Sequence, residues 1–177
     1  MCRRDRASGG TTQTLYLARS LTIQGGYTNT NWNTSYPITQ PTILDALNPL
    51  APLSRGRVIS ITAPSATFVN LTIQNGHVIS DSGGGIYALF SSANDGITMT
   101  GSTLSGNESG WRGGGAYLMG GGAEFTNSTT SGNTSGAGGG GLSLAYPTGA
   151  LTPTPLSATM AVNPVGAIHT DYDNTHK

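Results

Sequence analysis

A repeat with a period of about 26 residues runs through the second half of the chain. The stretch SGNESGWRGGGAYL, which starts at Ser105, returns as SGNTSGAGGGGLSL from Ser131, an offset of 26 residues. An earlier glycine triplet starts at Gly83, 30 residues before the triplet at Gly113. Self-similarity at a nearly fixed period is the signature of a repeat architecture, in which each unit buries its apolar face only against its neighbours.

The aligned repeats place residues of the same character in the same columns. After each glycine triplet, the first and third columns are apolar and the second is polar or amphipathic. These columns are Ile86, Ala116 and Leu142, then Tyr87, Tyr117 and Ser143, then Ala88, Leu118 and Leu144. A second set is Ala66, Ile97 and Ala123, then Thr67, Thr98 and Glu124, then Phe68, Met99 and Phe125. Alternation with a period of two predicts strands that are buried on one face.

The period also selects the architecture. No window carries an apolar stripe at helical spacing, and the chain has 27 glycines, each of which costs about 1 kcal/mol inside a helix. A propeller blade needs about 40 residues or more, whereas about 26 suit one coil of a β-helix. We therefore predict an all-β fold, a right-handed parallel β-helix (β-solenoid) over residues 15–146 with roughly five coils. Residues 1–14 are expected to be an irregular N-terminal segment and residues 147–177 an irregular or linker-like tail.

Glycine and asparagine between the strands are predicted to have structural roles. Glycine permits a positive φ at the corners and a close approach of neighbouring backbones, and stacked asparagines can hydrogen-bond along the axis of the solenoid. The residues assigned to corners and ladders are Gly76, Asn107, Asn133, Gly83, Gly84, Gly85, Gly113, Gly114, Gly115, Gly139, Gly140 and Gly141.

The composition excludes several classes of function. The net charge is zero, charged residues make up 9% of the chain, and Lys177 is the single lysine, so no basic stripe for nucleic acid exists. No apolar run approaches the roughly 20 residues that span a bilayer. Acidic residues in the repeats are few, and none occupy equivalent positions on neighbouring coils: Asp45, Asp81, Asp95, Glu108 and Glu124. We therefore expect no metal, no cofactor and no complete catalytic site.

One group of side chains departs from the repeat, between the asparagine corner and the glycine triplet. Trp111 and Arg112 stand where the next coil has Ala137 and Gly138. The columns place His77 beside Glu108, and Asp81 close to Trp111 and Arg112. An aromatic ring beside an arginine and carboxylates can bind a sugar. The plainer interpretation is a surface Asp81–Arg112 pair worth about 0 to 1 kcal/mol, with Trp111 covering a corner. The candidate ligand-binding residues are His77, Asp81, Glu108, Trp111, Arg112, Tyr87 and Tyr117.

The same motifs carry a family resemblance. GGGIYAL, GGGAYLM and GGGGLSL, alternating with STLSGN and STTSGN, resemble right-handed parallel β-helix repeats of bacterial surface proteins related to the polymorphic outer membrane proteins. Thr130 stands where those repeats have an apolar residue. LTIQGGYTNTNWNTSYPITQPTIL is similar to the opening of predicted secreted β-helix proteins, in which a Gly-Gly-Tyr corner precedes a long loop.

The resemblance implies a non-enzymatic structural or adhesive module of an exported bacterial surface protein. It also implies a polysaccharide or cell-surface glycan as partner, and further coils of a longer protein of which this chain is a fragment. Pectate lyases and related enzymes share the fold, so a polysaccharide lyase or glycoside hydrolase with an incomplete site in this chain is the first alternative. A nonfunctional truncated product is the second.

Overall fold

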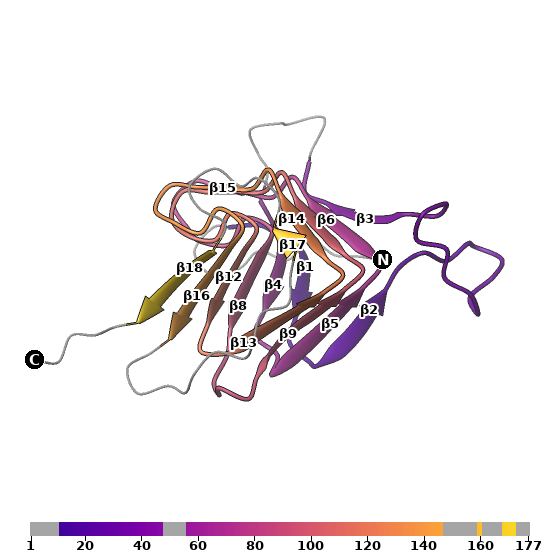
Figure 1. Cartoon of the computed structure of the whole chain (residues 1–177), viewed down its shortest axis with the longest axis horizontal. Coiled ribbons are helices and arrows are strands. Elements are labelled where there is room, and N and C mark those ends of the chain that lie inside the picture. The colour runs from indigo at the N-terminus through magenta and orange to yellow at the C-terminus, as the bar shows by residue number, and fades with distance from the viewer. Residues whose placement is uncertain (1–10, 48–55, 147–158, 161–167, 173–177) are drawn as a thin grey trace, which may run out of the picture.

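The chain folds into a parallel β-solenoid, as the repeat predicts. The computed structural model describes residues 11–47, 56–146, 159–160 and 168–172. Within these ranges the chain contains strands and no helix, and every pair of neighbouring strands is parallel (Figure 1). The all-β class and the parallel β-helix are thus confirmed.

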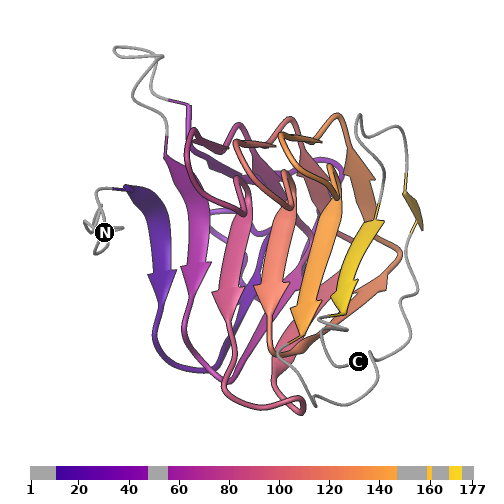
Figure 2. The ribbon, with the colours of Figure 1, turned by 90° about the vertical axis from the view of Figure 1, so that its left-hand side faces the viewer.

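The strands form four sheets, and each complete turn of the solenoid adds one strand to every sheet. The first sheet consists of β1 (Gln13–Leu17), β4 (Arg57–Ile61), β8 (Ile86–Leu89), β12 (Ala116–Met119), β16 (Leu142–Tyr146) and β18 (Ile168–Tyr172), side by side in chain order (Figure 2). The second consists of β2 (Leu21–Gln24), β5 (Ser65–Val69), β9 (Gly96–Thr100) and β13 (Gly122–Thr126). The third consists of β3 (Thr42–Asp45), β6 (Leu71–Gln74), β10 (Thr103–Ser105), β14 (Thr129–Ser131) and β17 (Thr159–Met160). The fourth consists of β7 (His77–Val78), β11 (Glu108–Ser109) and β15 (Thr134–Ser135).

The solenoid has about three turns, so the expected number of five was wrong. Three turns in the described residues contain all four strands, namely β4–β7, β8–β11 and β12–β15. The first turn is much longer than the period suggests, because Leu15 pairs with Ile59, 44 residues later. Dividing the length of the repeat region by 26 therefore overestimates the number of coils, because many of its residues form a long insertion between β2 and β3.

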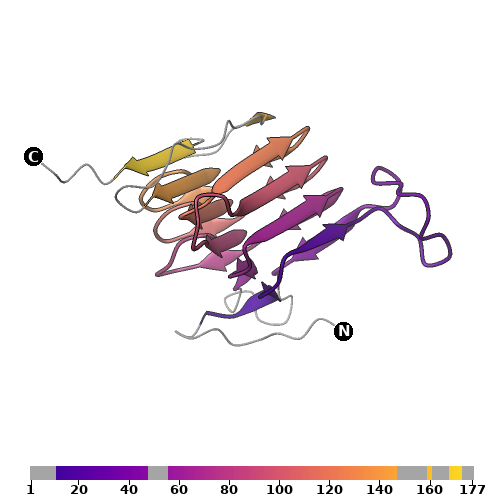
Figure 3. The same ribbon diagram turned by 90° about the horizontal axis from the view of Figure 1, so that it is seen from below.

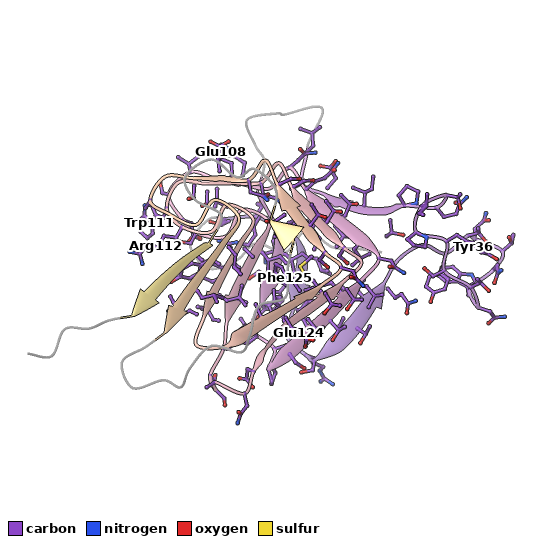
Figure 4. All side chains as sticks on the ribbon, viewed as in Figure 1. Tyr36, Glu108, Trp111, Arg112, Glu124 and Phe125 are labelled. Atoms are coloured by element: carbon purple, nitrogen blue, oxygen red, sulfur yellow. The ribbon has the colours of Figure 1, made fainter. Side chains whose placement is uncertain are left out.

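The register confirms the sequence columns. Ala116 pairs with Ile86 on one side and with Leu142 on the other, and Ile97 pairs with Ala66 and Ala123. The column with the largest side chains faces the interior of the solenoid, where Phe68, Met99 and Phe125 are fully buried. Burial of each such side chain contributes about 1.5 to 3 kcal/mol. Glu124, between two buried neighbours, points out of the sheet (Figure 4).

Corners between the second, third and fourth sheets use one residue each in a left-handed conformation. Asn75, Gly106 and Gly132 occupy the same corner in successive turns, with φ of 60°, 60° and 61°. Glycine and asparagine tolerate this region better than other residues, so the corners explain why these two residue types recur between the strands.

The glycine triplets have two roles. Their first members, Gly83, Gly113 and Gly139, are also left-handed, with φ of 70°, 62° and 64°, and the glycines that follow allow a close approach of backbones. A Cβ on Gly84 would lie 2.8 Å from the backbone carbon and 2.9 Å from the backbone nitrogen of Glu108. These glycines therefore let the backbones of successive turns pack against each other, as predicted.

Two short strands fall in the segment expected to be an irregular or linker-like tail. β18 pairs in parallel register with β16, and β17 pairs with β14. The residues on either side of these strands, like residues 1–10, lie outside the described part of the chain.

Candidate ligand-binding surface

Three bends connect the fourth sheet to the first, and the candidate residues lie on or beside them. The bends comprise residues 79–85, 110–115 and 136–141, and they lie side by side in successive turns (Figures 1 and 2). Backbone hydrogen bonds hold them together: Gly83 donates to the carbonyl of Arg112 at 2.9 Å, and Gly113 donates to that of Gly138 at 3.2 Å. Side chains on the bends therefore have defined neighbours in the turns before and after.

His77 and Glu108 face each other across neighbouring turns. They are register partners in β7 and β11, and Nδ1 of His77 lies 2.9 Å from Oε2 of Glu108. Their side chains are 23% and 53% exposed, so the pair is a surface contact, charged on both sides when His77 is protonated. The predicted proximity of these two residues is correct.

Asp81 is paired with a buried arginine, Arg57. Its carboxylate accepts a hydrogen bond from Nη2 of Arg57 at 2.7 Å, and the Arg57 side chain is only 3% exposed. Arg57 also donates to the carbonyls of Ser82 and Gly83, at 2.8 and 2.9 Å. Its guanidinium carbon lies 4.4 Å from the centre of the Tyr87 ring. The expected ion pair was with Arg112, whereas the buried Arg57 of the preceding turn ties Asp81 into the bend.

Trp111 and Arg112 are held through their backbones. Trp111 donates from its amide to the carbonyl of Asp81 at 3.1 Å and accepts from the amide of Ala137 at 2.7 Å. The amide of Arg112 donates to Oγ of Ser82 at 3.3 Å. Trp111 is 59% exposed, so most of its surface faces solvent.

The candidate residues divide into three adjoining groups. Figure 4 shows Glu108 on the upper side of the bends and Trp111 with Arg112 at their outer tip. Tyr87 and Tyr117 lie on the first sheet just after the bends, where they are register partners and their rings stack with centroids 5.6 Å apart. Trp111 and Arg112, consecutive in the chain, therefore lie at the tip of the bends, with the His77–Glu108 pair in the sheet before them and the tyrosine stack in the sheet after them.

Tyr87 is more constrained than Tyr117. Burial raises the pKa of the Tyr87 phenol above its usual value, and the nearby Asp81 carboxylate raises it further, against a smaller lowering by Arg57. A half-buried phenol under a guanidinium is part of the structure of the bend, and Tyr117 stacks on it from the next turn.

Sequence reasoning missed a groove on the outer face of the second sheet. The groove has a volume of about 550 Å³ and is lined by the loop before β9 and by β9 and β13, with Asp95 and Glu124 in its wall. Oδ2 of Asp95 accepts from the amide of Ser92 at 3.0 Å. The two acidic residues belong to successive turns but not to one column, and therefore the column test did not place them together.

Neither a metal-binding cluster nor a membrane-spanning helix occurs among the described residues. In the described part of the chain, no three His, Cys, Asp or Glu side chains gather in a way that could hold a metal ion. Over the same residues, no helix has the length and apolar character needed to cross a membrane.

Comparisons with known proteins do not assign this chain to a family. No model of a protein family matches the sequence, and neither a curated protein nor a solved structure matches it.

Proposed function

We propose that this chain is a non-enzymatic structural or adhesive module of an exported bacterial surface protein, and that it binds glycan at the bends. The proposal rests chiefly on Trp111, whose ring is 59% exposed although its backbone is fixed on both sides. An aromatic side chain on a hydrogen-bonded backbone offers a flat face to a sugar, and with few side-chain torsions it loses little conformational entropy on binding. Arg112 beside it and the His77–Glu108 pair provide hydrogen-bonding groups for hydroxyls.

The state of the acidic residues supports a non-enzymatic role. Asp81 is bonded to Arg57, Glu108 to His77, and Asp45 to Nδ2 of Asn75 at 3.0 Å. Each of these three carboxylates is thus engaged in a contact within the solenoid. The placement at a bacterial surface rests on the resemblance of the glycine-triplet repeats.

The groove on the second sheet favours the enzymatic alternative. Glycoside hydrolysis uses two carboxyl groups on either side of a glycosidic bond, and the groove contains Asp95 and Glu124. A polysaccharide lyase or glycoside hydrolase would therefore act there and not at the bends.

One set of variants separates the two functions. The full chain is applied to a glycan array as wild type, Trp111→Ala, Arg112→Ala and Glu124→Gln. The adhesive function predicts binding that falls at least about tenfold in both bend variants, equivalent to about 1.4 kcal/mol, and persists in Glu124→Gln.

Turnover is measured in parallel. Polygalacturonate with Ca²⁺ is assayed for unsaturated products, and neutral polysaccharides for new reducing ends. Turnover that Glu124→Gln abolishes would establish the enzyme and refute the adhesive function. Binding that both bend variants retain would refute the bend as the glycan site.

A further inference from the structure

The insertion between β2 and β3 is far longer than the solenoid needs. Later turns cross from the second to the third sheet with Asn70 alone, with residues 101–102, or with residues 127–128. The first turn uses residues 25–41 at this position, which we call the arm, and Figures 1 and 3 show it extending away from the sheets. Since a corner of one or two residues closes the same turn, the arm is not required by the fold. Loops of this length in compact domains commonly have a function of their own.

The arm has a fixed base. Oγ of Ser35 donates to the carbonyl of Gly25 at 2.7 Å and accepts from Nδ2 of Asn70 at 3.1 Å. The amide of Tyr36 donates to the carbonyl of Gly26 at 2.6 Å, and the amide of Gly26 donates to Oγ1 of Thr42 at 3.0 Å. These bonds tie the arm to the third sheet and to the next corner, which makes it a preorganised element and lowers the entropy lost on binding.

Large apolar side chains of the arm face solvent. Trp32 is 72% exposed, Ile38 93% and Tyr36 43%, and Figure 4 shows Tyr36 far from the sheets. The Trp32 ring stacks on that of Tyr27 with centroids 6.0 Å apart and an interplanar angle of 23°. The stack holds the indole in place without burying it, so one face of Trp32 is presented outward.

The arm carries no charge. From Ser20 to Leu44 the sequence contains no Asp, Glu, Lys, Arg or His, and threonine and asparagine fill the positions around the aromatics. Nucleic acids and anionic lipid surfaces are bound chiefly by lysine and arginine, so neither suits this surface. Amides and hydroxyls beside an exposed ring suit an uncharged ligand rich in hydroxyl groups.

A groove lies where the arm meets the solenoid. Its volume is about 310 Å³, with Pro37 and Ile38 of the arm on one side and Asn70, Thr72 and Thr103 of the solenoid on the other. This volume falls at the lower end of the range for small-molecule sites, about 300 to 1,000 Å³. A standard protein interface uses about 20 to 30 residues on each side. The arm has 17 residues, so its size suits a small ligand better than a protein partner.

From these observations we propose that the arm is a second carbohydrate-binding site, which takes uncharged oligosaccharides by stacking sugar rings on Trp32 and Tyr36. The C–H groups on one face of a pyranose ring carry partial positive charge, and the face of an aromatic ring is negative. The sugar hydroxyls are left to the amides and hydroxyls of the arm and of the groove. This site does not depend on the bends, and it holds whether or not Trp111 contacts a ligand.

The two tryptophans of the chain allow each surface to be tested separately. In Trp111→Ala all tryptophan emission comes from the arm, and in Trp32→Ala all of it comes from the bends. The full chain is screened on a glycan array that contains neutral and anionic glycans, and is then titrated with the best neutral oligosaccharide and with polygalacturonate. Phosphatidylcholine vesicles serve as the probe for membrane binding.

The arm site predicts that a neutral oligosaccharide changes the emission of Trp32 in Trp111→Ala. Affinity in Trp32→Ala and in Tyr36→Ala is expected to fall at least about tenfold, with far-ultraviolet circular dichroism unchanged because both side chains are exposed. Absence of any Trp32 response to neutral glycans overturns the proposal, as does equal affinity in Trp32→Ala. A Trp32 response to vesicles or polygalacturonate alone overturns it too. A response of Trp111 without one of Trp32 supports the bend site and refutes the arm.

Discussion

Nδ2 of Asn107 donates a hydrogen bond to Oδ1 of Asn133, one turn further along the solenoid, at 2.9 Å, and both side chains are completely buried. Oδ1 of Asn107 in turn accepts from the amide of Gly76 at 2.9 Å. The two asparagines thus satisfy buried backbone groups of the two turns that precede Asn133. They connect three successive turns through side chains as well as through the sheets.

Replacing Asn107 with alanine should therefore destabilise the solenoid strongly. The change leaves the amide of Gly76 and the carbonyl of Ile73 without their partner, and each unsatisfied buried group costs about 1 to 3 kcal/mol. We expect a loss of about 2 to 4 kcal/mol in the free energy of unfolding, measured by urea denaturation. Asn29→Ala, at an exposed position of the arm, is the control and should stay within about 0.5 kcal/mol of wild type. A loss in Asn107→Ala no larger than that of the control would contradict the ladder.

Arg57 should not be replaceable by lysine. An ammonium cannot reproduce the planar set of donors to Asp81, Ser82 and Gly83, nor the stacking on an aromatic ring. Arg57→Lys should lower the free energy of unfolding by about 1 to 3 kcal/mol, the range for a lost buried hydrogen-bond partner. The exposed Arg19 provides the matched exchange, and Arg19→Lys should be neutral. Equal stability of the two variants would show that Arg57 acts only as a charge.

Replacement by alanine should cost more at Gly84, in a glycine triplet, than at the corner glycine Gly106. Gly84→Ala places a Cβ against the backbone of Glu108, for which we expect a loss of about 3 kcal/mol or more. At Gly106 the nearest atom to a new Cβ is 3.5 Å away and φ is 60°, so alanine should cost only the left-handed conformation, about 1 to 2 kcal/mol.

Gly106→Asn should cost less than Gly106→Ala, because Asn75 has the same φ in the equivalent corner. Thermal denaturation of Gly84→Ala, Gly106→Ala and Gly106→Asn measures the three losses of stability and ranks them. The order would be refuted if Gly106 proved as intolerant of both substitutions as Gly84 is of alanine.

The raised pKa of Tyr87 predicts a loss of stability at alkaline pH. Burial, chiefly, keeps this phenol protonated in the folded protein at pH values where the unfolded chain, with a pKa of about 10, releases the proton. The unfolded state then binds fewer protons than the folded state, so stability is fully present below about pH 10 and falls as pH rises through the folded pKa. Tyr87→Phe should reduce this decline, as measured by urea denaturation below and above pH 10. An identical decline in wild type and Tyr87→Phe would assign the effect to other groups.

Much of the fold could be predicted because register in a solenoid follows directly from sequence offset. The offset of 26 residues is enough to place Leu118 beside Leu144, and the offset of 31 places His77 beside Glu108. The number of turns could not be predicted in the same way, because the arm lengthens the first turn without altering the pattern around it.

Arg57 escaped detection for a related reason. It lies in the glycine-triplet column, two residues before Ile59, which pairs with Ile86, but the turn that contains Arg57 has no glycine triplet to mark the column. An arginine in a column of glycines is itself a signal, since its side chain must find space inside or across the next turn. Asp95 and Glu124 meet in one groove because the loop before β9 lies beside β13, a relationship that no column contains.

Because the three bends share one register, the solenoid presents equivalent outward positions at regular intervals. Outward positions recur with the spacing of neighbouring strands, about 4.8 Å, and Ala137, exposed and one turn beyond Trp111, is such a position. Ala137→Trp would place a second indole one strand spacing from the first without a change in any corner or glycine triplet. Affinity for a polymeric ligand could thus be tuned by the number of turns that present a ring, while the scaffold beneath stays the same.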